Sequence, residues 1–198
     1  MVIRDGVAKP LTAAGFERVG QKRRWARPTA ELLHIVVVGY RHGSYDVEFL
    51  LGCPPASVIL TGAEPAEPSD PEFALALGAA YDLRRPARLS GFRLRDGMGD
   101  DEVAKLAENA REDAAAIAAW LGRFQTRADL RRHLVETRGT GFAWPTGDMG
   151  LVDLTAAALA VLDHSPDADE LVETVATAFA RWPDDERVRR LRAAARTS

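Results

Sequence analysis

Two neighbouring apolar segments, Leu32–Arg41 and Tyr45–Cys53, set the strongest limit on how this chain can fold. The first segment is nearly all apolar and rich in β-branched residues, which favour strands. The second begins with alternating apolar and acidic residues, a pattern typical of a strand with one buried face. A short link that includes Gly43 joins them, as in a hairpin turn. The pair therefore predicts an antiparallel hairpin.

Further strands and a helix are expected around this hairpin. The basic segment Gln21–Arg27 precedes it, and Leu89–Arg95 supplies a possible fourth strand. Gly15 lies where a left-handed helix C-cap is expected, after apolar residues that recur at helical spacing, namely Ile3, Val7, Leu11 and Ala14. We therefore predict an N-terminal helix and an antiparallel sheet of three to four strands over residues 1–98.

The second half of the chain, residues 99–198, has helical periodicity. Asp100 or Asp101 is expected to cap a long helix that ends near Phe124. Thr126 with Asp129 resembles a capping box for the next helix. Further helices are expected over Leu151–Asp163, from Ser165-Pro166 and from Pro183. Because strands precede helices, we predict an α+β fold, with one domain over residues 1–198 that ends in a bundle of about four helices.

The segment Pro54–Pro86 holds six of the eleven prolines. We expect a proline-rich loop over residues 54–71, with sustained regular structure least favoured in Gly62–Pro71, and then a short helix over Phe73–Tyr81. Glu64–Pro71 has a proline at every third position, which favours an extended backbone. It also lacks a large apolar side chain. We therefore predict that this part of the proline-rich loop 54–71 lies on the surface and is cut first by proteases.

The composition excludes several classes of protein. The 198 residues carry a formal net charge of −3, which argues against a bulk nucleic-acid binder. The longest stretch without a charged residue, Phe49–Ala63, is too short to span a bilayer, and the N-terminus lacks an apolar signal core. The single cysteine, Cys53, excludes an internal disulfide. We expect a soluble, cytoplasmic protein without membrane contact.

The chain contains none of the sharp motifs for phosphate, zinc or nucleophile chemistry. Gly139-Thr140-Gly141 starts like a dinucleotide fingerprint, but Trp144 stands in place of the third glycine. No catalytic residue, metal ligand or cofactor is therefore predicted from a motif. This pattern favours a non-catalytic protein-binding module, such as a regulatory or immunity protein.

A set of polar strand residues supports an enzymatic alternative. His34 lies in the apolar strand with the same parity as Tyr40, and Asp46 and Glu48 share one face of the next strand. Neighbouring carboxylates on one strand face lie about 7 Å apart, which suits a glycosidase-like pair or a divalent ion. If His34, Tyr40, Asp46 and Glu48 converge, they would form the site of a hydrolase or a metal-dependent enzyme. The other interpretation is a hydrogen-bonded strand histidine beside solvent-facing carboxylates.

Basic residues cluster in two segments. Arg18–Arg27 contains five basic residues and no acid, and Tyr81–Met98 contains five arginines and two aspartates. If both lie on one sheet face, they would hold an anion or an acidic partner. The residues expected to take part are Arg23, Trp25, Arg27, Arg84, Arg85 and Arg88. We expect a protein partner, and nucleic-acid binding through these clusters is a second alternative that the net charge disfavours. Neither the partner nor the oligomeric state follows from the sequence.

A family resemblance emerges from three parts of the chain. The first runs from Lys9-Pro10-Leu11 through Gly15-Phe16 and Trp25 to the strand end Phe49-Leu50-Leu51-Gly52. The others are Trp120–Leu130 and the helical end Leu151–Arg192. Together they resemble the bacterial family called domain of unknown function 4304. Members of that family tend to carry polar residues where this chain has Val38 and Leu50. The resemblance implies no activity and no catalytic residues.

Overall fold

The computed structural model describes residues 2–20, 23–41, 44–64, 74–76, 92–93, 97–136 and 149–197. For residues 40–41, 44–46, 48, 74–76, 92–93, 149 and 151 it describes the backbone alone. The fold is α+β, as predicted, with an antiparallel sheet, an N-terminal helix and C-terminal helices.

The chain divides into two compact units, which we describe one at a time. Unit 1 comprises Met1–Pro28, His34–Leu51 and Ala76–Arg123. Unit 2 comprises Thr29–Leu33, Gly52–Leu75 and Phe124–Ser198. Whether residues 1–198 behave as one cooperative domain stays a prediction.

The sheet of unit 1 is the antiparallel meander that the sequence predicts. Its strands follow in the order β1 (Glu17–Arg18), β2 (Arg24–Pro28), β3 (Leu33–Arg41) and β4 (Ser44–Gly52). In β1 and β2, Glu17 pairs with Ala26 and Arg18 with Trp25. Strand β6 (Phe92–Arg93) pairs antiparallel with β4, within the segment expected to add a fourth strand.

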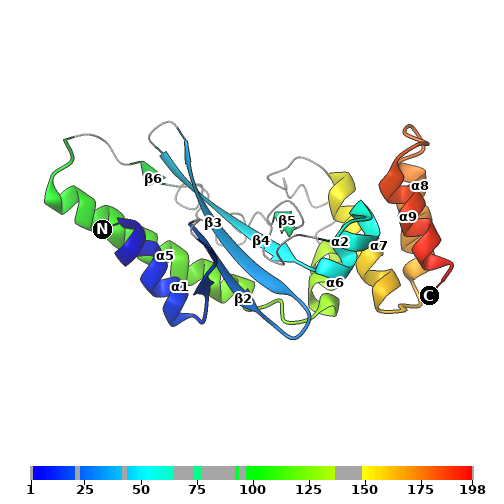
Figure 1. Cartoon of the computed structure of the whole chain (residues 1–198), viewed down its shortest axis with the longest axis horizontal. Helices are drawn as coiled ribbons and strands as arrows, with labels where there is room; N and C mark the ends of the chain where they lie inside the picture. The colour runs from blue at the N-terminus through cyan, green and yellow to red at the C-terminus, as the bar shows by residue number, and fades with distance from the viewer. Residues whose placement is uncertain are drawn as a thin grey trace. The chain divides into compact units, whose positions relative to one another are not determined.

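Three helical segments pack beside one another in unit 1 (Figure 1). The N-terminal helix is a π-helix, η1 (Val2–Ala8), that continues into α1 (Lys9–Ala13), and both contact α5 (Asp100–Leu121). Pro10 has no N–H to donate to the Gly6 carbonyl, so the α-helical bonding pattern is interrupted here. As expected, Gly15 follows in the left-handed region, with φ +83°.

The start and the end of α5 differ from the prediction. The N-cap is Gly99, whose N–H donates to the Glu102 carboxylate at 3.1 Å, and not Asp100 or Asp101. The helix ends at Leu121, before Phe124. The carboxylate three residues after the cap thus accepts from the N–H of the cap residue, which is one half of a capping box.

The prediction of irregular structure from Pro54 onward is wrong for its first part. Helix α2 (Pro54–Thr61) forms there, in unit 2. Its two prolines occupy the first helical positions, where no intrahelical N–H bond is needed, so they start the helix instead of breaking it. The short helix expected over Phe73–Tyr81 is also wrong where the structure describes it, because β5 (Ala74–Ala76) is a strand. Residues 65–73 and 77–91 lie outside the described residues, so the extended surface loop stays a prediction.

The rest of unit 2 is the predicted bundle of four C-terminal helices. These are α6 (Arg127–Glu136), α7 (Met149–Leu162), α8 (Ala168–Ala178) and α9 (Glu186–Ala195). Helix α7 contacts α2, α6, α8 and α9, and its residues from Leu154 to Val161 are all buried. A helix that is apolar on every side is expected at the centre of such a bundle.

Two helix starts in unit 2 lie later than predicted. The Ser165 N–H donates to the Ala160 carbonyl at 2.9 Å and so closes the end of α7; α8 begins at Ala168 after the N-cap Asp167. Likewise, Pro183 lies inside a turn in which the Asp185 N–H donates to the Trp182 carbonyl at 3.0 Å. Asp185, not Pro183, then caps α9 by accepting from the Arg187 N–H. In both places, the residues that were predicted to start a helix form a tight turn instead.

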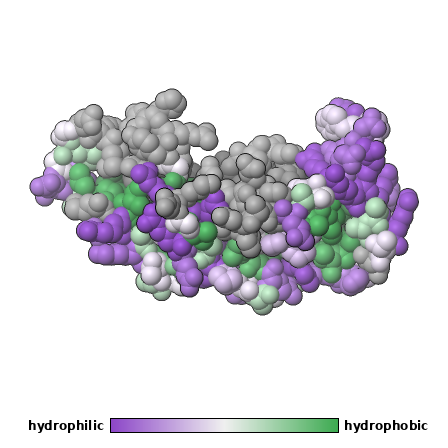
Figure 2. Space-filling view, in the orientation of Figure 1, coloured by the Kyte–Doolittle hydropathy of each residue, from purple (hydrophilic) through white to green (hydrophobic). Residues whose placement is uncertain are grey.

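The surfaces of α8 and α9 that face the viewer in Figure 2 are mainly hydrophilic. Helix α9 is amphipathic, with Val188 and Leu191 buried and Arg189 and Arg192 exposed. Within the described ranges, no helix has both the length and the apolar character needed to cross a bilayer.

Candidate functional site

The residues predicted to form an anion or partner site lie in different environments. Arg23, just before β2, is exposed, whereas Trp25 is 3% exposed and belongs to the core of unit 1. Arg27 is half-buried. The other three residues lie outside the described part of the chain, so a shared arginine surface stays a prediction: Arg84, Arg85 and Arg88.

The guanidinium of Arg27 connects several segments of unit 1. Its Nε and Nη2 donate to Nδ1 of His34 at 3.2 and 2.9 Å. Its Nη1 donates to the Ala14 carbonyl at 2.9 Å, and Nη2 also donates to the Ala118 carbonyl at 3.2 Å. The guanidinium carbon lies 4.6 Å from the ring centre of Phe16. Burial lowers the pKa of Arg27 from its usual value, and these acceptors and the ring replace the lost water.

His34 is fully buried, and its Nδ1 is occupied by Arg27. Because arginine only donates hydrogen bonds, Nδ1 of His34 accepts, and the imidazole is neutral with its proton on Nε2. Nδ1 is therefore not open to a metal ion or a substrate proton. The side chains of Tyr40, Asp46 and Glu48 lie outside the described part of the structure, so their convergence with His34 stays a prediction.

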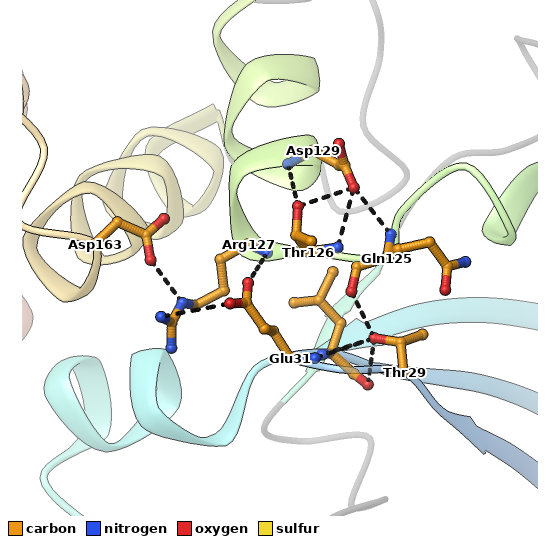
Figure 3. A network of polar contacts seen from close by, with 8 residues as sticks. Thr29, Glu31, Gln125, Thr126, Arg127, Asp129 and Asp163 are labelled. Carbon is orange, nitrogen blue, oxygen red and sulfur yellow. Dashed lines mark hydrogen bonds and ion pairs between the residues drawn. The ribbon is translucent and has the colours of Figure 1, made fainter.

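A second polar network lies in unit 2, around Arg127 (Figure 3). The Arg127 Nε donates to the Asp163 carboxylate at 2.7 Å, and its backbone N–H donates to the Glu31 carboxylate at 2.8 Å. The Thr29 hydroxyl donates to the Gln125 carbonyl at 2.9 Å. These bonds attach the turn Thr29–Leu33 to α6 and to the end of α7. Each of these contacts joins protein groups, which indicates a structural role.

The capping box predicted for α6 is confirmed in the same network. The Asp129 carboxylate accepts from the Thr126 N–H at 3.0 Å, and the Asp129 N–H donates to the Thr126 hydroxyl at 3.2 Å. The Gln125 N–H also donates to this carboxylate, at 3.2 Å. The hydrogen bond from the Thr126 side chain contributes most to lowering the pKa of Asp129, although partial burial opposes it. Aspartate thus takes the place of the usual glutamate at this position.

Cys53, at the start of α2, is a buried thiol. Burial raises its pKa, so the thiol is protonated at neutral pH and is a poor nucleophile. Among the described residues, no group of three or more histidines, cysteines, aspartates and glutamates could hold a metal ion.

A cavity of about 830 Å³ opens at the turn that joins α8 to α9 in unit 2. A cavity of this size falls in the range that ligands occupy. The α7 residues Gly150 and Asp153 form one side of it, and the α8–α9 turn forms another. Its wall includes Asp153, Phe179, Arg181, Trp182, Asp184 and Arg187.

Trp182 distinguishes this cavity from the rest of the described surface. The residue is 62% exposed, and it and Val135 are the exposed large hydrophobic residues in the part of the chain that the structure describes. The Trp182 N–H donates to the Phe179 carbonyl at 2.8 Å, and its carbonyl accepts from the Asp185 N–H at 3.0 Å. Its ring centre lies 5.9 Å from that of Phe179. The turn thus presents an exposed indole on an ordered backbone.

The charged groups between Arg181 and Arg187 that line the cavity fall into two classes. Arg187 is already paired, because its Nη2 donates to the Asp185 carboxylate at 2.7 Å and its guanidinium carbon lies 5.5 Å from the Phe179 ring centre. Hydrogen bonds from the Arg187 side chain make the largest contribution to lowering the pKa of Asp185. In contrast, the side chains of Arg181 and Asp184 are exposed and form no hydrogen bond or ion pair with other described residues. These two remain available to a ligand.

Sequence reasoning missed this cavity. The one sequence feature that could have indicated it is Trp182, which lies in the short segment Arg181–Asp185. This segment connects two predicted helices whose apolar residues were assigned to the core. A large aromatic residue there is expected either to pack under the turn or to protrude from it, and periodicity does not separate these outcomes.

Comparisons with protein-family models, with curated proteins and with solved structures found no match for this chain. The resemblance to domain of unknown function 4304 therefore stays a prediction, and the functional conclusion below depends on the geometry of the described residues.

Proposed function

We propose that this chain is a protein-binding module of regulatory or immunity type, and that unit 2 binds its partner at the cavity of the α8–α9 turn. The observation that carries this proposal is the 62% exposure of Trp182 at that cavity. Tryptophan is usually highly buried, and it is enriched among the residues that contribute most to binding at protein interfaces.

The backbone around Trp182 favours binding without a large ordering cost. Hydrogen bonds on both sides of the residue, from its N–H to Phe179 and from Asp185 to its carbonyl, fix the turn. The N-cap bond from the Arg187 N–H to the Asp185 carboxylate, at 2.9 Å, then fixes the start of α9. A contact surface that is ordered before association loses less conformational entropy when a partner binds.

The described wall of the cavity supports recognition more than catalysis. It contains carboxylates, guanidiniums and aromatic rings, but the described lining residues include no cysteine, serine or histidine. The Asp185 carboxylate is occupied by Arg187 and by the helix N-terminus. A small apolar centre with charged groups around it is the arrangement typical of protein interfaces.

A display selection tests the proposed function. Peptides that tile the proteome of the source organism are selected on the wild-type protein and, in parallel, on Trp182→Ala. We expect binders that are enriched on the wild type and lost on the variant. The control is Val135→Ala, which truncates the other exposed large hydrophobic side chain. If no binder depends on Trp182 more than on Val135, the proposed site is wrong.

A further inference from the structure

The two units carry net charges of opposite sign. Unit 1 contains 16 basic and 12 acidic residues, for a net charge of +4, and unit 2 contains 10 basic and 17 acidic residues, for a net charge of −7. The cavity with Trp182 therefore lies in an acidic unit. A field of this sign increases the rate at which basic partners arrive and decreases it for acidic ones.

The described wall of the cavity is net negative, as unit 2 is as a whole. The described wall contains three carboxylates, Asp153, Asp184 and Asp185, and two guanidiniums, Arg181 and Arg187. The pair Arg187–Asp185 is internally neutral, and Arg187 is further held over the Phe179 ring. The described lining residues together thus carry one more negative than positive charge.

The exposed indole of Trp182 also favours a cationic ligand. The face of a tryptophan ring is electron-rich and attracts ammonium and guanidinium groups more strongly than other aromatic rings do. The Arg187–Phe179 contact shows that the same cavity already holds one guanidinium against an aromatic ring. Trp182 offers a ring of the same chemistry that is still open to solvent.

We propose that the partner inserts an arginine or lysine side chain into this cavity, with its cationic group over the ring of Trp182 and within reach of Asp184. This inference rests on the proposed function and adds the chemistry of the ligand. Arg181, at the same wall, opposes entry of a second cation. The site is therefore suited to a single basic side chain and not to a run of them.

Binding of defined peptides tests this proposal. The probes are fluorescent octapeptides of glycine and serine with one central arginine, lysine, glutamine or glutamate. The Trp182 indole N–H resonance is followed in parallel, as a direct report on the site. We expect the arginine and lysine peptides to bind and to shift that resonance, and the glutamine and glutamate peptides to bind more weakly.

Two substitutions separate the ring from the charge. Trp182→Leu keeps apolar bulk but removes the π face, and we expect it to weaken binding of the arginine peptide about three- to tenfold. Asp184→Asn removes one carboxylate, and Asp169→Asn removes one from the exposed first turn of α8 as the matched control. Asp184→Asn should weaken binding more than Asp169→Asn does, because a distant charge acts only through the screened field of the unit. All three positions are exposed, so the fold should be kept, which thermal unfolding checks.

Particular outcomes would overturn this proposal and leave the proposed function intact. If the display selection gives Trp182-dependent binders that are acidic or neutral, the cavity binds a partner but not through a basic side chain. If the glutamine peptide binds as well as the arginine peptide, or if Asp169→Asn weakens binding as much as Asp184→Asn, then no cation site exists here. Absence of any Trp182-dependent binder would instead contradict the proposed function itself.

Discussion

Arg27 and His34 lie opposite each other on β2 and β3, and the Arg27 guanidinium donates to the His34 imidazole through both Nε and Nη2. The backbone bonds from Thr29 to Leu32 and from Val38 to Arg23 set the register that brings the two residues together. The same guanidinium also bonds the carbonyls of Ala14 and Ala118. One side chain thus joins α1, both strands and the end of α5 within unit 1.

Replacement of this guanidinium should destabilise the protein. Arg27→Lys keeps the charge but removes the planar fork, so several buried acceptors lose their donor. We expect the free energy of unfolding to fall by about 2–4 kcal/mol, measured by urea unfolding with tryptophan fluorescence. Arg196→Lys, at an exposed arginine after α9, is the matched control and should change stability by less than about 0.5 kcal/mol. Equal effects of the two substitutions would show that Arg27 has no such role.

The tautomer of His34 is a second consequence of this contact. Because Nδ1 accepts from Arg27, the proton of the neutral ring lies on Nε2. Long-range nitrogen–proton NMR spectra at neutral pH should show a non-protonated Nδ1 and a protonated Nε2. The exposed His164 provides the internal comparison, since no described contact selects one tautomer there. A protonated Nδ1 on His34 is incompatible with the described geometry.

Gly6 allows the close approach of η1 to α5. A β-carbon at this position would lie 2.7 Å from the Ala107 carbonyl oxygen and 2.8 Å from the β-carbon of Ala110. Gly6→Ala should therefore destabilise the protein by about 1–3 kcal/mol, despite the better helix propensity of alanine. The measurement is urea unfolding. Gly99→Ser is the control, because nothing lies within 4 Å of that β-carbon position and only a few tenths of a kcal/mol, roughly, separate glycine from serine at an N-cap.

The stability that Asp185 supplies should depend on pH. Hydrogen bonds from Arg187 lower its pKa in the folded state, although burial opposes them. Because the folded-state pKa lies below the unfolded value of about 3.9, the carboxylate stabilises the fold above that pH. This contribution is lost as the pH falls through the folded-state pKa. The difference in unfolding free energy between wild type and Asp185→Asn should therefore be full near pH 6, roughly, and shrink toward about pH 3.

Asp184→Asn is the neighbouring control for this titration. The Asp184 side chain is exposed and has no partner among the described residues. We expect Asp184→Asn to change the free energy of unfolding less than Asp185→Asn does near pH 6, roughly. If Asp185→Asn gives a difference that stays constant as the solution is acidified, the ion pair with Arg187 does not contribute to stability.

Elements with a local pattern were predictable from the sequence. The meander follows from the apolar and alternating segments around Gly43, and the Thr126–Asp129 capping box follows from side-chain chemistry within one helical turn. Helix α2 was missed because Pro54 and Pro55 resemble helix breakers, although the first two helical positions tolerate proline. Local rules thus predicted the type of most elements but not always their first residue.

The candidate site depended on tertiary packing and was therefore harder to predict. Arg27 and His34 were assigned to separate hypotheses, an anion surface and a polar strand site, and the strand register unites them in one buried contact. Trp182 gave no periodic signal, because its exposure depends on how the α8–α9 turn packs on α7. A register argument based on the turn at Thr29–Leu32 would have found the first pair. No comparable argument was available for Trp182.

His164 adopts a left-handed backbone, with φ +48°, directly after α7. The bonds from the His164 N–H to Val161 and from the Ser165 N–H to Ala160 form the C-terminal turn in which glycine is preferred. Its side chain is exposed, so His164→Gly should remove backbone strain without loss of packing and raise the free energy of unfolding by about 0.5–1 kcal/mol. His164→Ala is the matched control, because it removes the imidazole but keeps the β-carbon that causes the strain. We therefore expect the alanine variant to show no gain in thermal or urea unfolding, and equal stabilisation by both substitutions would place the strain in the imidazole and not in the backbone.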